Sequence, residues 1–191
     1  RAFLAAFLEF GNDEVYYWTY AKYPDWSHFD HPGMVGWVMQ LFSLNLLFDS
    51  ELALRLSSVV FMTINTYIIY KMGCLIKNKL TGFYAALLYT SSVYAFVVTG
   101  ILILPDTPLM LFMLLSLYCF LRFFIGREKN NGESWKNDNV MLVLGGFLAG
   151  LSMLSKYSGV FIWSGVGLYV LLYDRKLLKN KYLYISVFLS A

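Results

Sequence analysis

Residues 81–105, TGFYAALLYTSSVYAFVVTGILILP, decide the fold class because they contain no charged side chain. A helix needs about 20 consecutive apolar residues to cross the hydrocarbon core of a bilayer. Residues 139–155 and 157–173 form two further uncharged runs. Only 14% of the whole chain is charged and 59% is hydrophobic, whereas a soluble domain carries about 25% charged residues. The sequence therefore predicts an all-α integral membrane protein.

The distribution of apolar runs predicts how the chain is organised. We expect complete spans at about 52–76, 81–104, 108–125 and 157–173, a shorter but uncharged fifth span at about 139–155, and partial helices at 1–10 and 182–191. An outer loop, residues 11–51, would separate the first partial helix from the first complete span. We interpret the chain as the N-terminal part of one multi-span domain, cut from a longer protein.

Basic residues predict the orientation in the membrane. Most of the fifteen Lys and Arg residues flank three connections, near 77–80, 126–138 and 174–181: Lys71, Lys77, Lys79, Arg122, Arg127, Lys129, Lys136, Arg175, Lys176, Lys179 and Lys181. The positive-inside rule places these connections in the cytoplasm. The opposite, exoplasmic face would then collect most of the acids and both histidines.

The segment Pro32–Phe48 leaves two topologies open. It is apolar throughout and could be a short span, or it could lie in the interface as an amphipathic helix. Its leading Pro-Gly pair and the many Tyr and Trp residues before it favour the interfacial arrangement. In that arrangement residues 11–51 form one long exoplasmic loop, which is too long to be a simple connector.

The acids of this face are candidates for chemistry, although each also has a local explanation. Asp13 and Glu14 could act as catalytic groups or only stabilise the start of a helix, and Asp106 has the same alternative. Asp30 and His31 could bind a divalent cation such as Mg, Mn or Zn, or could be polar groups at headgroup level.

Two isolated cations suggest a phosphate. Lys156 and Arg55 lie near the exoplasmic ends of their apolar runs, where they could neutralise a phosphate or extend toward lipid headgroups. Acids and cations on one face suit a lipid-linked phosphate substrate whose tail stays in the bilayer. A non-catalytic transporter or lipid-binding protein is the alternative, but 81–104, 139–155 and 157–173 contain no ionisable residue at mid-membrane.

Other classes lack support in the sequence. There is no phosphate-binding G-x-x-x-x-G-K-[ST] loop and no dinucleotide fingerprint. The basic residues flank membrane segments, so nucleic-acid binding is not indicated. Cys74 and Cys119 lie in apolar runs without metal-ligand spacing, and a disulfide between them is not expected.

Several short motifs occur in the order found in one group of enzymes. Residues 12–17 read NDEVYY, 29–33 read FDHPG, 105–112 read PDTPLMLF and 155–159 read SKYSG, and Asp49 precedes Arg55 at the entry to a span. With these motifs the chain resembles bacterial membrane glycosyltransferases of the protein-mannosyltransferase-like (GT-C) superfamily. That group includes the aminoarabinose transferase of lipid A and the rhizobial galacturonosyltransferases of lipopolysaccharide core.

The resemblance implies eleven to thirteen transmembrane helices in an inner membrane and an active site at the periplasmic face. It also implies inverting transfer of a hexose or pentose from a polyprenyl-phosphate donor to lipid A, a glycan or a protein. By motif position Asp13 corresponds to the catalytic aspartate and Asp106 to a second acid, while Asp30 corresponds to the acid placed to hold a metal. Tyr17 and Lys156 correspond to substrate-binding positions.

Two positions depart from the pattern of this group. His31 stands where the lipid A enzymes have a phosphate-binding lysine, and Gly33 stands where a proline or leucine is usual. A histidine at this position could bind either phosphate or a metal ion.

Overall fold

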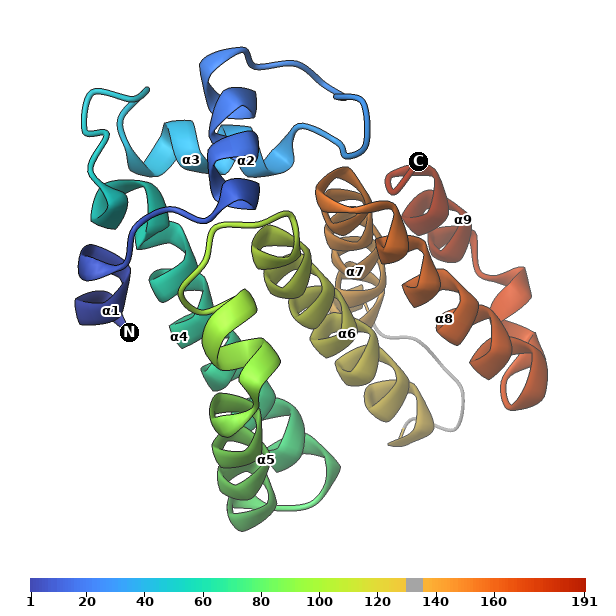
Figure 1. Cartoon of the computed structure of the whole chain (residues 1–191). Helices are drawn as coiled ribbons and strands as arrows, with labels where there is room; N and C mark the ends of the chain where they lie inside the picture. The colour runs from blue at the N-terminus through green and yellow to red at the C-terminus, as the bar shows by residue number, and fades with distance from the viewer. Residues whose placement is uncertain (130–135) are drawn as a thin grey trace.

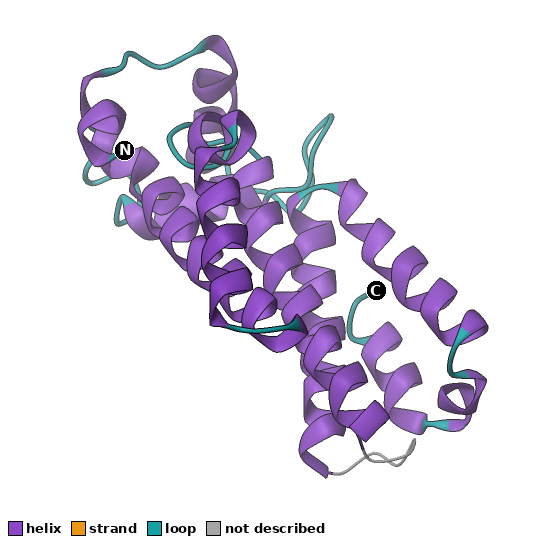
Figure 2. Ribbon diagram, turned by 90° about the horizontal axis from the view of Figure 1, so that it is seen from below, coloured by secondary structure: helices purple, strands orange, loops and turns teal. Residues whose placement is uncertain are grey.

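The computed structural model describes residues 1–129 and 136–191, and within them the regular structure is helical (Figures 1 and 2). The elements are α1 (Ala2–Phe7), α2 (Asn12–Lys22), α3 (Met34–Phe42), α4 (Glu51–Ile76), α5 (Lys79–Ser91), η1 (Tyr94–Val98), α6 (Asp106–Lys129), α7 (Lys136–Ser155), η2 (Tyr157–Val160), α8 (Phe161–Leu172), η3 (Arg175–Lys179) and α9 (Lys181–Phe188). An isolated β-bridge joins Ser27 to Pro32.

In the described part of the chain, three helices are long and apolar enough to cross a bilayer, which confirms the expected all-α membrane class. They comprise Glu51–Ile76, Asp106–Glu128 and Asp138–Ser155. At 1.5 Å per residue, 18 residues extend about 27 Å, close to the thickness of a hydrocarbon core. A shorter apolar helix, Tyr157–Leu172, follows α7 and begins as the 3₁₀ turn η2.

The uninterrupted helix expected over 81–104 does not form, and this is a correction to the sequence analysis. Helix α5 ends at Ser91, the π-helix η1 follows, and residues 99–105 lead irregularly into α6. The Ser91 hydroxyl donates to the Leu87 carbonyl at 2.8 Å, and the Ser92 hydroxyl donates to the Tyr89 carbonyl at 2.9 Å. Serine side chains compete with backbone amides for such carbonyls, so this polar pair is a natural place for the helix to end.

Helices α2 and α3 form a layer across one end of the long helices (Figure 1). Helix α3 has nine residues, about 14 Å, and cannot cross a bilayer. Three consecutive residues with left-handed φ angles, Leu44, Asn45 and Leu46, follow its end. The structure therefore supports the second arrangement of Pro32–Phe48, in which the segment does not span.

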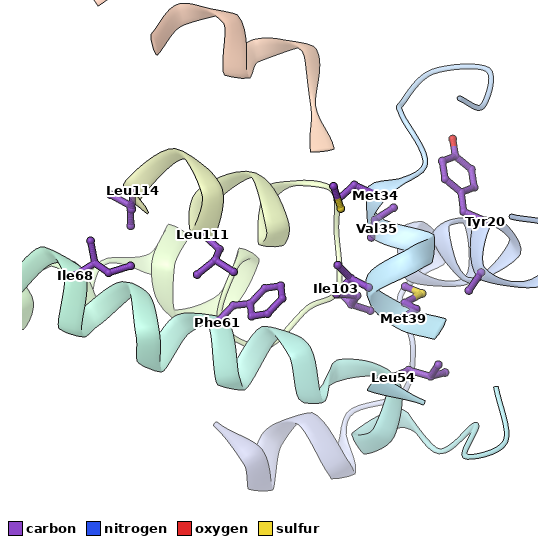
Figure 3. Close-up of a cluster of buried hydrophobic side chains, with 12 residues drawn as sticks. Tyr20, Met34, Val35, Met39, Leu54, Phe61, Ile68, Ile103, Leu111 and Leu114 are labelled. Atoms are coloured by element: carbon purple, nitrogen blue, oxygen red, sulfur yellow. The ribbon is translucent and has the colours of Figure 1, made fainter. Parts of the chain in front are cut away.

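The α2–α3 layer shares a core with the bundle below it. Met34, Val35 and Met39 of α3 are buried in one cluster with residues of α4 and α6 (Figure 3). At Gly36, α3 lies so close to α2 that a Cβ atom would be 2.6 Å from the Tyr20 carbonyl carbon. This contact packs the two helices of the layer tightly against each other, because no side chain larger than hydrogen fits there.

The two ends of the bundle differ in charge. The α4–α5 turn, the last turn of α6 and η3 lie at the end away from α2 and α3, and we call this the basic end (Figure 1). The other end, which we call the acidic end, carries the α2–α3 layer, residues 99–105 and the α7–η2 junction. Residues 130–135 of the expected 126–138 connection are outside the described part of the chain.

Candidate active site

Arg55 of α4 is fully buried and forms a structural ion pair with Glu14 of α2. Its Nε donates to Glu14 Oε1 at 2.7 Å, and its Nη2 donates to Glu14 Oε2 at 2.5 Å. The remaining N–H groups donate to the backbone carbonyls of Ala5, Leu8 and Glu9. A guanidinium has five N–H donors, so none is left for a phosphate. The predicted phosphate-binding role of Arg55 is wrong in this structure.

Glu14 is likewise fully committed. Besides its bonds with Arg55, the carboxylate accepts hydrogen bonds from the Ile103 amide at 3.1 Å and from the Gly11 amide at 3.2 Å. Only 1% of Glu14 is exposed, so the carboxylate cannot reach a substrate without losing these bonds. We therefore correct its predicted catalytic role. Glu14 instead connects α2 to α4 and to the 99–105 segment, which leads into Asp106.

Asp13, the neighbour of Glu14, points the other way. Successive helical residues are rotated by about 100°, so burial of Glu14 leaves Asp13 exposed. Asp13 lines a pocket of about 290 Å³ between the start of α2 and residues Leu102 and Leu104. Its carboxylate has no hydrogen bond or ion pair with any residue in the described part of the chain. It is therefore available for contact with a substrate.

Asp106 and Lys156, fifty residues apart in sequence, form an ion pair at the acidic end. The Lys156 ammonium lies 3.0 Å from both carboxylate oxygens of Asp106. The side chain of Lys156 is 32% exposed and that of Asp106 is 19% exposed, so the pair borders solvent. Tyr94 of η1 donates its hydroxyl to Asp106 Oδ1 at 2.7 Å. The pair therefore holds the Lys156 ammonium at the surface.

Asp30 lies in the loop between α2 and α3 and is held by two tyrosines. The hydroxyl of Tyr16 donates to Asp30 Oδ1 at 2.9 Å, and the hydroxyl of Tyr20 donates to the same oxygen. The Tyr20 hydrogen bond is the main cause that lowers the pKa of Asp30. The Asp30 carboxylate therefore stays charged at more acidic pH than an ordinary aspartate.

The charges of Asp13, Asp30 and Asp106 all affect the pKa of Tyr17. Burial is the largest cause that raises the pKa of Tyr17 to about 12, followed by the negative charges of Asp30 and Asp13 and a smaller effect of Asp106. These acids must therefore lie near enough to Tyr17 to act on its ionisation. At neutral pH its hydroxyl keeps its proton and can donate a hydrogen bond. The charges of Asp13, Asp30 and Asp106 thus all act on Tyr17, and Lys156 is paired with Asp106, whereas Glu14 and Arg55 are buried and paired with each other.

Sequence reasoning missed several polar partners. Tyr94, Tyr16, Tyr20 and His28 were not predicted, yet three of them bond to the predicted acids and His28 stacks on Tyr20 with ring centroids 3.6 Å apart. The density of aromatics around residues 16–28 is the available signal, but it is also typical of a membrane-interface layer. For Tyr94, inside an apolar run, the sequence carries no local signal.

The predicted metal site is incomplete in the described residues. No three His, Cys, Asp or Glu side chains among them converge as a set of ligands. Two hydroxyls occupy Oδ1 of Asp30, while Nδ1 of His31 is buried without a partner in the described part of the chain. These residues alone therefore do not fit a resident metal ion.

A family model places the chain among known enzymes. The model for dolichyl-phosphate-mannose-protein mannosyltransferase matches residues 30–191, which include Asp30, Asp106 and Lys156 but not Asp13 or Tyr17. No curated protein and no solved structure matched. The match covers most of the chain, in agreement with the apolar helices. The chain belongs to the dolichyl-phosphate-mannose-protein mannosyltransferase family and is a membrane glycosyltransferase of the GT-C kind.

Proposed function

We propose that the protein transfers a sugar, with inversion, from a polyprenyl-phosphate donor to an acceptor outside the cytoplasm. The observation that carries this proposal is the arrangement at the acidic end. The Asp13 carboxylate has no partner among the described residues, Asp106 holds the Lys156 ammonium at the surface, and the charges of Asp13 and Asp106 both act on Tyr17. The acceptor is lipid A, another glycan or a protein, and the motif resemblance to the lipid A and core transferases favours the first two.

In the proposed reaction Asp13 acts as the general base. It takes the proton of an acceptor hydroxyl, whose oxygen forms a bond to the anomeric carbon of the sugar. The bond between that carbon and the phosphate oxygen breaks, and the polyprenyl phosphate leaves with the electron pair. Attack opposite the leaving group inverts the configuration of the anomeric carbon.

Lys156 would stabilise the leaving phosphate. Its ammonium carries three donors, and Asp106 accepts through both oxygens without burying the group. A charge-assisted bond to phosphate is stronger than a neutral one. Tyr17, which keeps its proton at neutral pH, could donate a second hydrogen bond. Asp106 would then position Lys156 rather than take part in proton transfer.

Replacing Lys156 by Gln tests the phosphate contact. We expect affinity of the full-length protein for polyprenyl phosphate to fall about 10- to 100-fold, the usual worth of a hydrogen bond to a charged group. Titration in detergent micelles would measure it. Lys22→Gln is the matched control, because Lys22 is another basic residue at the acidic end and stacks over Trp18. Equal affinities of wild type and Lys156→Gln would contradict the role.

The membrane orientation is tested by cysteine labelling. Single cysteines at Ser27 and Lys179, in an otherwise cysteine-free full-length protein, should react with an impermeant maleimide from opposite sides of the membrane. Both positions are exposed at opposite ends of the bundle. Labelling of Ser27→Cys from the periplasm places the acidic end outside. Labelling of both cysteines from one side would contradict the proposed topology.

A divalent cation remains a prediction for Asp30 and His31. Because these residues do not complete a site, such an ion would need ligands from the donor phosphate or water. We expect chelator to weaken donor binding by wild type and to have no further effect on Asp30→Ala. Donor binding that resists both chelator and Asp30→Ala would exclude a metal at this position.

A further inference from the structure

A large cavity lies at the basic end, far along the helices from the proposed active site. It has a volume of about 650 Å³ and is formed between the last turns of α6 and of α8, with η3 closing one side. This volume is within the range of small-molecule sites. The positive-inside rule places the basic end at the cytoplasmic surface, so the cavity would border the inner leaflet.

One wall of the cavity is aromatic and apolar. The rings of Phe124 and Tyr169 lie 4.2 Å apart between centroids, and Tyr169 contacts Tyr173 at 5.5 Å. Leu172, also in the lining, is exposed. A wall of this kind offers a path for an acyl chain, while the tyrosines suit the boundary between hydrocarbon and headgroups.

The lining also contains three basic groups, Arg127, Arg175 and Lys176, and two acidic groups, Glu128 and Asp174. Arg127 is paired with Asp174, which neutralises that acid. Arg175 uses its Nε to donate to the Leu171 carbonyl at 2.9 Å, and its terminal amino groups have no partner within the described residues. Lys176 is exposed and also has no ion pair there. Two cations are therefore available beside an apolar wall.

We propose that this cavity binds an anionic phospholipid of the inner leaflet. Arg175 and Lys176 would hold the phosphate, and one acyl chain would lie along Phe124 and Tyr169. A zwitterionic lipid would be bound less well, because its choline or ethanolamine group repels the same cations. This site is separate from the proposed transfer reaction and does not depend on it.

The test compares two double variants of the full-length protein that remove the same charge. Arg175→Gln/Lys176→Gln changes the cavity, whereas Lys179→Gln/Lys181→Gln changes neighbouring exposed cations outside its lining. Purified protein in detergent would be titrated with short-chain phosphatidylglycerol and bound lipid counted by native mass spectrometry. We expect the cavity variant to raise the Kd about 30-fold and the control to raise it less than about threefold.

Further titrations separate the ligand sources. Phosphatidylcholine of the same chain length and glycerol 3-phosphate should both bind wild type at least about tenfold more weakly than phosphatidylglycerol. An equal loss of affinity for phosphatidylglycerol in both double variants would overturn the proposal, because it would indicate a general attraction of the lipid to the basic surface. Equal binding of glycerol 3-phosphate would also overturn it. If the double variant does not fold, Lys176→Gln alone should raise the Kd about fivefold, and an unchanged Kd would contradict the proposal.

Discussion

Replacing Asp13 by Asn in the full-length protein is expected to lower the rate of sugar transfer about 10²- to 10⁴-fold, the usual contribution of a general base. Asparagine has nearly the same shape but cannot accept the acceptor's proton. Because Asp13 is exposed and makes no hydrogen bond with the described residues, the change should leave the fold intact. Transfer from the polyprenyl-phosphate donor in proteoliposomes would measure the effect.

Asp25→Asn is the matched control for this experiment. Asp25 is another exposed acid of the same segment, and its Oδ1 accepts the Trp26 amide at 2.7 Å, a bond that asparagine can keep. We expect this variant to transfer sugar at nearly the wild-type rate. If Asp13→Asn also transferred sugar at nearly the wild-type rate, with the same midpoint of thermal unfolding as wild type, Asp13 would not be the general base.

Replacing Arg55 by Met should destabilise the protein by about 3–5 kcal/mol, because it leaves the Glu14 carboxylate buried and unpaired. It also removes three hydrogen bonds, one to a carbonyl of α1 and two to carbonyls of the segment that joins α1 to α2. The free energy of unfolding in detergent would measure this. Arg122→Met, at an exposed position of α6, should change it by less than about 0.5 kcal/mol.

A double variant separates a structural role of Arg55 from a phosphate contact. Glu14→Gln/Arg55→Met removes both charges, so it should recover part of the stability lost in Arg55→Met. If Arg55→Met instead kept the wild-type stability and lost only affinity for polyprenyl phosphate, the buried pair would not be the main role of Arg55.

The sequence alone determined the class of the protein and the end of the bundle at which its unusual polar residues gather. Long uncharged runs can satisfy the hydrogen bonds of their backbone groups in a bilayer only as helices. The positions of Lys and Arg indicate which end of each helix faces the cytoplasm. These signals are local, so α4, α6 and α7 fall close to the expected ranges. The break after Ser91 was harder to predict, because two serines lower the mean hydropathy of a long apolar run only slightly, whereas their hydroxyls can interrupt the helix.

Only the tertiary structure decided which polar residues remain available for chemistry. Asp13 and Glu14 are neighbours of the same charge, but α2 packs so that one is exposed and the other is enclosed with Arg55. The pairing of Asp106 with Lys156 likewise depends on α6 and α7 lying side by side. A motif gives the type and spacing of side chains, whereas burial and partners depend on contacts between segments far apart in the chain. For that reason the sequence located the candidate site, and the packing of α2 on α4 separated its reactive residues from its structural ones.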